Sequence, residues 1–163
     1  MKITITWAAA LLLTGLLITG KVWAHQPSDK VLNMFHQAAS EADFERYFSL
    51  LADNAVFLGT DAGERWTKAE FAAYVEPYFS RGRGWTYQVE SRNYTVVESE
   101  GLVLFDEILS NSTYGKCRGS GVLKRGESGW QIMQYNLSIP IPNDIASKVV
   151  KQIKQYEIGE QRE

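Results

Sequence analysis

Two adjacent carboxylates interrupt an otherwise apolar segment, residues 102–109, and are the first candidates for chemistry. They are Asp106 and Glu107. Side chains of a β-strand alternate between its two faces, so one of these carboxylates is expected to face the protein interior. Burial disfavours the ionised form of a carboxylate, and a carboxylate tuned in this way can act as a general acid or base. The alternative, which we prefer, is a structural ion pair with Arg118 or Arg125.

The segment 130–139 is predicted to carry amide and apolar side chains on opposite faces of a strand. Alternation puts Gln134 and Asn136 on one face. Amides donate and accept hydrogen bonds but do not transfer protons near neutral pH, so this face is predicted to recognise a ligand rather than to catalyse. The opposite face is apolar or aromatic, and we expect a second copy of the chain to cover it. Its side chains are Met133, Tyr135, Leu137 and Ile139.

Two glycines, Gly119 and Gly121, are expected to pair near Asn136 and Gln134 across a hairpin. Their missing side chains have two interpretations. They leave room for a ligand, or they mark a β-bulge that curves the sheet.

Aromatic residues are concentrated before the predicted sheet and predict the walls of a pocket. Tyr47 and Phe57 belong to this group, and Trp66 directly precedes a helix-capping sequence that runs from Thr67 to Glu70. Trp66 is either a pocket wall or a hydrophobic staple beside the cap. Together with Arg118, Gln134 and Asn136, these aromatic residues form the candidate ligand-binding set. The ligand is expected to be small and apolar or cyclic, and no cofactor or metal is expected.

The elements that must position these residues follow from hydrophobic periodicity. Helical spacing begins at Ser28 or Asp29 and again after Asp43, and alternating spacing replaces it from Trp85 onward. Strands are predicted at 55–58, 85–97, 102–109, 116–124 and 130–139, the last four as an antiparallel meander. A final helix is predicted to begin at Asn143 and to carry an apolar stripe. Whether this helix packs on the domain or projects from it is left open by the sequence. Helices packed on one side of a meander predict an α+β domain.

The first 24 residues have the features of a signal peptide. Lys2 precedes an apolar run, and Val22-Trp23-Ala24 supplies a cleavage pattern. We therefore expect an exported, periplasmic or secreted protein, residues 25–163, that forms one domain and has no membrane segment after cleavage. The whole chain has a formal net charge of −2, which disfavours nucleic acid as a partner. Cys117 is the only cysteine, so no intramolecular disulfide can form.

The order of elements and several segments resemble a SnoaL-like domain of the nuclear transport factor 2-like superfamily. The similarity extends over about residues 28–143 and includes segments 55–61, 66–67, 103–107, 118–125 and 129–132. It implies a cone-shaped, curved antiparallel sheet around a pocket, and commonly a homodimer through the outer face of the sheet. In related domains the last strand often has histidines where this chain has Gln134 and Asn136. The scaffold is reused for many functions, so the resemblance predicts the fold rather than the activity.

Three functions are consistent with these residues. The first is a pocket that binds a small, partly apolar molecule. The second is an enzyme similar to ketosteroid isomerases or dehydratases, in which Asp106 or Glu107 moves a proton and a tyrosine stabilises an oxyanion. The third is a non-catalytic interaction module. Amides beside a neutralised carboxylate would favour the binding pocket, and a buried unpaired carboxylate would favour the enzyme. A pocket collapsed by its own side chains would favour the interaction module.

Overall fold

The computed structural model describes residues 27–127 and 129–160, so the predicted signal peptide lies outside the described residues. Three helices and two strands come first, then a four-stranded meander and a last helix. The elements are α1 (Pro27–Glu41), α2 (Phe44–Ser49), β1 (Leu51–Leu58), β2 (Arg65–Thr67), α3 (Lys68–Phe79), β3 (Gln88–Val97), a 3₁₀ turn (Glu98–Glu100), β4 (Leu102–Asn111), β5 (Gly115–Gly126), β6 (Gly129–Ser138) and α4 (Asn143–Glu160).

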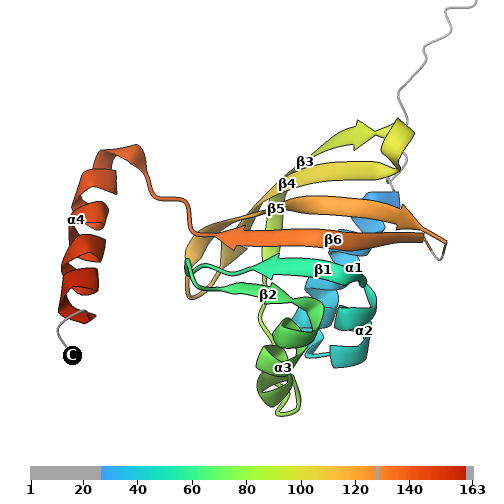
Figure 1. The fold of residues 1–163 in the computed structure, drawn as a ribbon, viewed down its shortest axis with the longest axis horizontal. Helices are drawn as coiled ribbons and strands as arrows, with labels where there is room; N and C mark the ends of the chain where they lie inside the picture. The colour runs from blue at the N-terminus through green and yellow to red at the C-terminus, as the bar shows by residue number, and fades with distance from the viewer. Residues whose placement is uncertain (1–26, 128, 161–163) are drawn as a thin grey trace, which may run out of the picture.

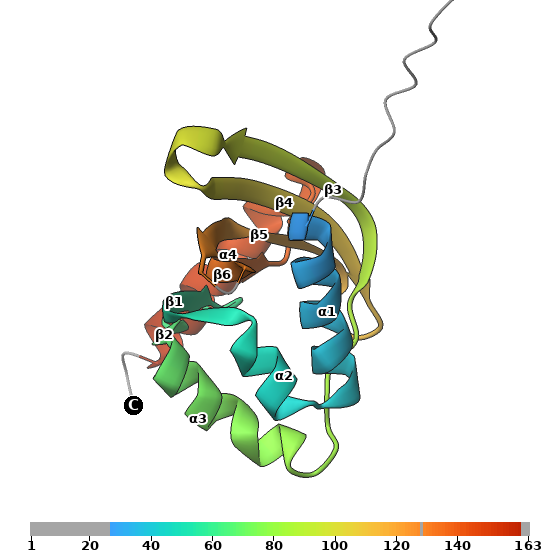
Figure 2. The ribbon, with the colours of Figure 1, turned by 90° about the vertical axis from the view of Figure 1, so that its right-hand side faces the viewer.

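All six strands form one sheet in the order β2-β1-β6-β5-β4-β3. The four later strands pair antiparallel in sequence order, which confirms the predicted meander. Strand β1 adds to β6 in parallel and carries the short strand β2 at the sheet edge. The sheet curves around α1, and α2 and α3 lie on the same side (Figures 1 and 2). The predicted α+β class is therefore confirmed.

A β-bulge in β6 reverses the predicted orientation of its second half. Leu123 pairs with Ile132 but Val122 pairs with Gln134, so Met133 is an extra residue in β6. An extra residue breaks the strict alternation of a strand. Ile132 and Tyr135 consequently both face the interior, with 0% and 2% of their surfaces exposed. The prediction that Tyr135 lies on the outer face, where a second copy of the chain would cover it, is therefore wrong. The homodimer itself stays a prediction.

Gly119 and Gly121 of β5 are needed for close packing rather than for ligand space. A Cβ atom at Gly121 would lie 1.9 Å from the Gln134 carbonyl oxygen, beside the bulge. A Cβ atom at Gly119 would lie 2.3 Å from the Tyr135 hydroxyl and 2.8 Å from a Glu107 carboxylate oxygen. Both distances are shorter than any normal contact, so larger residues would displace these groups. The bulge interpretation applies to Gly121, while protein side chains fill the space beside Gly119.

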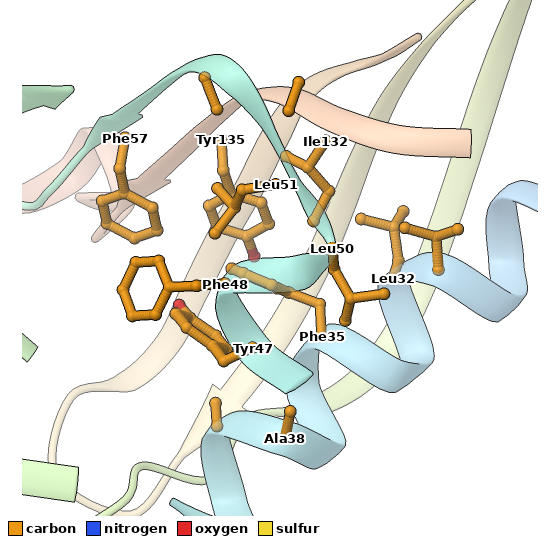
Figure 3. Packing of buried hydrophobic residues seen from close by; sticks show 14 of the residues in the cluster. Leu32, Phe35, Ala38, Tyr47, Phe48, Leu50, Leu51, Phe57, Ile132 and Tyr135 are labelled. Atoms are coloured by element: carbon orange, nitrogen blue, oxygen red, sulfur yellow. The ribbon is translucent and has the colours of Figure 1, made fainter. Parts of the chain in front are cut away.

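The core lies between the concave face of the sheet and the three N-terminal helices. Tyr135 and Phe57 extend from neighbouring strands toward Phe35 and Tyr47 on the helices (Figure 3). The Phe35 and Tyr47 rings stack with centroids 4.3 Å apart, and the Phe57 and Tyr135 rings stack at 5.6 Å. Aromatic pairs in these geometries contribute beyond their buried area, by about 0.5–1.5 kcal/mol each. This aromatic packing holds the helices against the sheet.

Local sequence signals position the helix starts. The Asp43 carboxylate accepts a hydrogen bond from the Arg46 N–H and caps α2, as predicted. Thr67 and Glu70 form the predicted capping box at the start of α3. Helix α2 ends at Ser49, and Leu51 already begins β1. Its side chain enters the core from the strand, so its burial does not distinguish a helix from a strand.

The C-terminal helix α4 projects away from the sheet instead of packing on it (Figure 1). Its apolar residues Ile145, Val150 and Ile153 are exposed. No helix within residues 27–127 and 129–160 is both long enough and apolar enough to span a membrane. The site described below therefore depends on α1–α3 and the sheet.

Candidate functional site

A buried carboxylate, Glu107, lies at the centre of the concave side and is fully inaccessible to solvent. One of its oxygens, Oε1, is 2.8 Å from His36 Nε2 on α1 and also 2.8 Å from the Tyr135 hydroxyl on β6. The other oxygen, Oε2, accepts a hydrogen bond of 2.7 Å from Arg92 Nε on β3. One helix and two strands thus supply partners to a single side chain of β4. We call Glu107, His36, Tyr135 and Arg92 the floor cluster.

Arg92 extends this cluster to the start of α1. Its Nη1 donates to the Asp29 carboxylate at 3.0 Å and to the Asn33 side-chain oxygen at 2.9 Å. The Tyr94 hydroxyl donates to the same Asp29 oxygen. Only 6% of the Arg92 side chain is exposed, so its guanidinium is compensated by two carboxylates rather than by water. The network ties α1 to β3 across the floor of the concave side.

The charge state of Glu107 follows from these partners. Burial by itself raises the pKa of a carboxylate, but here hydrogen bonds and charge from His36, the charge of Arg92 and the Tyr135 hydroxyl outweigh burial. The pKa of Glu107 is therefore lowered from its ordinary value. Tyr135 shows the opposite shift, because burial and the neighbouring carboxylate raise the pKa of its hydroxyl. Glu107 is an ionised acceptor near neutral pH and Tyr135 is a neutral donor.

This charge state determines how His36 is protonated. An ionised carboxylate only accepts hydrogen bonds, so His36 Nε2 must carry the proton that it shares with Glu107. The second ring nitrogen, Nδ1, has no hydrogen-bond partner among the described residues. A histidine held by a carboxylate at one nitrogen presents the other nitrogen for chemistry.

A cavity of about 210 Å³ lies above the floor cluster, between the sheet and the helices. His36 and Tyr135 belong to its lining, and ten of its sixteen lining residues are Phe, Tyr or Trp. The full set is Phe35, His36, Ala39, Tyr47, Phe57, Gly59, Thr60, Glu64, Trp66, Phe71, Tyr74, Trp85, Tyr87, Tyr114, Tyr135 and Leu137. Burial raises the pKa of Tyr87 to about 12, and the cavity thus presents neutral phenols. Within the described residues no cluster of three or more His, Cys, Asp or Glu side chains is arranged to hold a metal ion.

The predicted carboxylate pair is divided between the two faces of the sheet. Glu107 faces the interior, whereas Asp106 is exposed and accepts a hydrogen bond of 3.0 Å from Asn93. Glu107 is ion-paired, but with Arg92 and not with the predicted Arg118 or Arg125. Arg118 pairs with Ile108, one residue beyond Glu107, and is exposed. A one-residue offset places neighbouring side chains on opposite faces, which explains the different partner.

Of the candidate ligand-binding residues, Tyr47, Phe57 and Trp66 line the cavity. Trp66 also stacks on Phe71, with ring centroids 5.7 Å apart, so both of its sequence interpretations hold. Gln134 and Asn136 do not belong to the lining; Gln134 is exposed and Asn136 half-buried. The predicted recognition surface was wrong because the bulge at Met133 turns these amides to the outer face. Arg118 likewise lies outside the lining.

Sequence reasoning did not identify His36, Arg92 or Tyr135 as site residues. A signal existed for His36, because Leu32, Phe35 and Ala39 of the same helix are buried and surround its position on the helix face. A histidine inside an apolar stripe requires a buried partner. Strict alternation along 130–139 predicts Tyr135 on the outer face, because it does not include the bulge at Met133. Arg92 lies in a strand of mostly polar residues, and its pairing with Glu107 depends on strand register.

Removing the cation of the floor cluster should destabilise the protein strongly. Arg92→Met leaves a buried carboxylate with less compensation, and we expect the free energy of unfolding to fall by about 3 kcal/mol. Arg118→Met makes the same change at an exposed position of β5 and should alter the free energy of unfolding by less than about 0.5 kcal/mol. Urea unfolding at pH 7 measures both. Equal losses in the two variants would contradict the assignment of Arg92 as the partner of Glu107.

The lowered pKa of Glu107 also predicts the direction of acid sensitivity. Its stabilising contribution is present above the ordinary value of 4.5 and is lost as pH falls through the lower folded value. The stability of the wild type should therefore decrease on acidification below about pH 4.5 more steeply than that of Glu107→Gln. Urea unfolding of both proteins from pH 7 to acidic pH compares the slopes. Parallel slopes would show that Glu107 is not the group responsible.

Comparisons with known proteins agree with this architecture. No curated protein matches the chain. A cystatin-like domain of unknown function from Nostoc punctiforme is 15% identical with a TM-score of 0.59, and the match covers 82% of this chain and 94% of the other. An NTF2-like protein of unknown function from Pseudomonas putida is 14% identical with a TM-score of 0.58, and the match covers 70% of this chain and 84% of the other. A proposed dehydratase of the NTF2-like family from Streptomyces avermitilis is 15% identical with a TM-score of 0.57, and the match covers 71% of this chain and 95% of the other. At these identities the likeness shows the fold. A family model for the SnoaL-like domain matches residues 29–142, and the chain therefore belongs to the SnoaL-like domain family.

Proposed function

We propose that this domain binds a small, flat and largely apolar molecule in the cavity above the floor cluster. The observation that carries this proposal is an open cavity of about 210 Å³ whose wall is dominated by ten aromatic rings. An apolar protein cavity of about 150 Å³ is large enough for benzene, so this one suits a ligand of one or two rings. Aromatic walls with a few polar groups are typical of small-molecule sites.

The state of Glu107 favours binding over catalysis by a strand carboxylate. A carboxylate held by an arginine, a histidine and a tyrosine, with a lowered pKa, is a weak base. The polar groups offered to a ligand are instead the His36 ring, the Tyr135 hydroxyl and other phenols. Export from the cytoplasm remains a prediction from the N-terminal sequence, and on that basis the ligand would be met outside the cytoplasm.

Filling the cavity should abolish binding, and a neighbouring substitution on the other face should not. Leu137 lines the cavity while Asn136 points to the outer face. We expect Leu137→Trp to weaken binding of 2-naphthol at least about tenfold and Asn136→Trp to leave it within about twofold. Isothermal titration of the folded variants measures both constants. The reverse order would place the ligand on the outer face, and a wild type that binds neither 2-naphthol nor 4-tert-butylphenol would overturn the proposal.

A second candidate function, proton transfer by His36, is favoured by one specific observation. His36 lines the cavity, is held by Glu107 at Nε2 and has Nδ1 without a protein partner among the described residues. A carboxylate that orients an imidazole in this way supports general base catalysis. In this scheme Glu107 positions His36 and does not itself take the proton. This differs from the enzyme hypothesis drawn from the sequence, in which Asp106 or Glu107 is the base.

Proton abstraction can be tested with 5-nitrobenzisoxazole, a flat aromatic probe. A base removes its carbon-bound proton, the nitrogen–oxygen bond breaks and a coloured phenolate forms. We expect the wild type to accelerate this reaction and His36→Gln to lose roughly a hundredfold of that acceleration while still binding 2-naphthol. Asn136→Trp is the matched control and should retain the activity. Acceleration that survives in His36→Gln would contradict the role of His36, and absence of any acceleration would leave binding as the function.

A further inference from the structure

The cavity has an electrically distinct opening, formed where its lining reaches solvent. Among the lining residues, Tyr74 and Tyr114 are 44% and 52% exposed. Phe35 and Tyr135 of the same lining are each only 2% exposed. Glu64 is half-buried and belongs to the same lining. We call Glu64, Trp66, Tyr74 and Tyr114 the mouth. The mouth therefore combines three aromatic rings with one carboxylate.

We propose that the mouth selects ligands that carry a positively charged ammonium group attached to an apolar body, an inference that rests on the proposed binding function. A cation near the face of Trp or Tyr is attracted by the ring quadrupole. A neighbouring carboxylate adds direct charge attraction. Both features are present together at the mouth, and they favour the same type of head group.

The Glu64 carboxylate is fixed at the cavity by its own loop. Its Oε2 accepts a hydrogen bond of 3.1 Å from the Asp61 N–H, and its carbonyl oxygen accepts one of 2.9 Å from the Gly59 N–H. A Cβ atom at Gly59 would lie only 2.1 Å from Glu64 Oε2, so the carboxylate lies directly over this glycine. Gly59 is itself part of the lining. The absence of a side chain there lets the carboxylate reach the cavity.

Glu64 has no counterion in the part of the chain that the structure describes. None of the ion pairs found among residues 27–127 and 129–160 involves Glu64, whereas Glu107 of the floor cluster is paired with His36 and Arg92. No lysine or arginine occurs among the described lining residues. An anionic ligand would consequently meet repulsion at the mouth, and a cationic ligand would meet none from Lys or Arg. The unpaired carboxylate of Glu64 thus lies at the mouth, where a ligand enters, and not in the buried interior of the cavity.

The rings of the mouth line the same cavity as this carboxylate, and two of them stack on each other. Trp66 and Tyr74 stack with centroids 4.9 Å apart and planes inclined by 21°. Burial raises the pKa of the Tyr74 hydroxyl, and neighbouring groups that include Glu64 and Tyr114 raise it further. Glu64, Tyr74 and Tyr114 all belong to the lining of the same cavity. A head group at the mouth would therefore contact ring faces and the carboxylate at once.

Two ligands of the same shape and different charge test the proposal. They are (4-hydroxyphenyl)trimethylammonium and its neutral isostere 4-tert-butylphenol, and isothermal titration at low salt measures their dissociation constants. We expect the wild type to bind the cation about tenfold more tightly than the isostere. Glu64→Gln keeps the size and the Asp61 hydrogen bond but removes the charge, and should lose most of this preference. Asp61→Asn is the matched control, because it removes a charge from the same loop at a residue outside the lining, and should retain the preference.

The outcomes separate this inference from the proposed function. If 4-tert-butylphenol binds as tightly as the cation, or if Glu64→Gln keeps the preference, the selectivity assigned to the mouth is overturned while the binding cavity stands. If neither compound binds the wild type while 2-naphthol does, the selectivity is likewise overturned and the binding cavity stands. If 2-naphthol also fails to bind, both proposals are overturned. A preference that is lost equally in Asp61→Asn would show a general effect of loop charge and would also overturn the role of Glu64.

Discussion

The central constraint on this structure is that Glu107 is ionised and fully buried. An isolated carboxylate in such a place costs several kcal/mol, so the surrounding elements must supply donors. They come from α1 through His36, from β3 through Arg92 and from β6 through Tyr135. Because these donors are far apart in the sequence, satisfying one side chain fixes how the helix lies against the sheet. Gly119 completes the constraint, since a side chain at its position would displace the Tyr135 hydroxyl and Glu107.

The same constraint explains the cavity. Tyr135 and His36 are held at the floor by polar contacts, so neither is free to move upward and fill the space between the sheet and the helices. The walls are rings that stack mainly on one another, such as Phe57 on Phe71 with centroids 3.9 Å apart. A rigid polar floor with aromatic walls thus leaves a defined opening rather than a collapsed core.

Local sequence patterns predicted those parts of the fold that depend on local physics. The caps at Asp43 and Thr67, the change from helical to alternating period and the meander all follow from neighbouring residues. The candidate site depended instead on register, which one residue can change. The extra residue Met133 exchanged the inner and outer faces of half a strand, moving Tyr135 inward and Asn136 outward. A bulge is a long-range compromise between paired strands, and Gly121 was its only local trace. The pairing of Arg92 with Glu107 depends on a different register, the one between β3 and β4, which the sequence does not specify locally.

Glu64 of the mouth and Glu107 of the floor cluster differ in ways that assign them different physical roles. Glu107 is neutralised by partners from three elements, so its charge contributes to stability and to the orientation of His36 but exerts little attraction on a ligand. Glu64 is held only by backbone donors of its own loop and has no counterion among the described residues, so its field extends into the cavity. A charge that must stabilise a fold needs compensation, whereas a charge that must select a ligand has to remain uncompensated until the ligand arrives. The arrangement therefore separates stability at the floor from selectivity at the mouth.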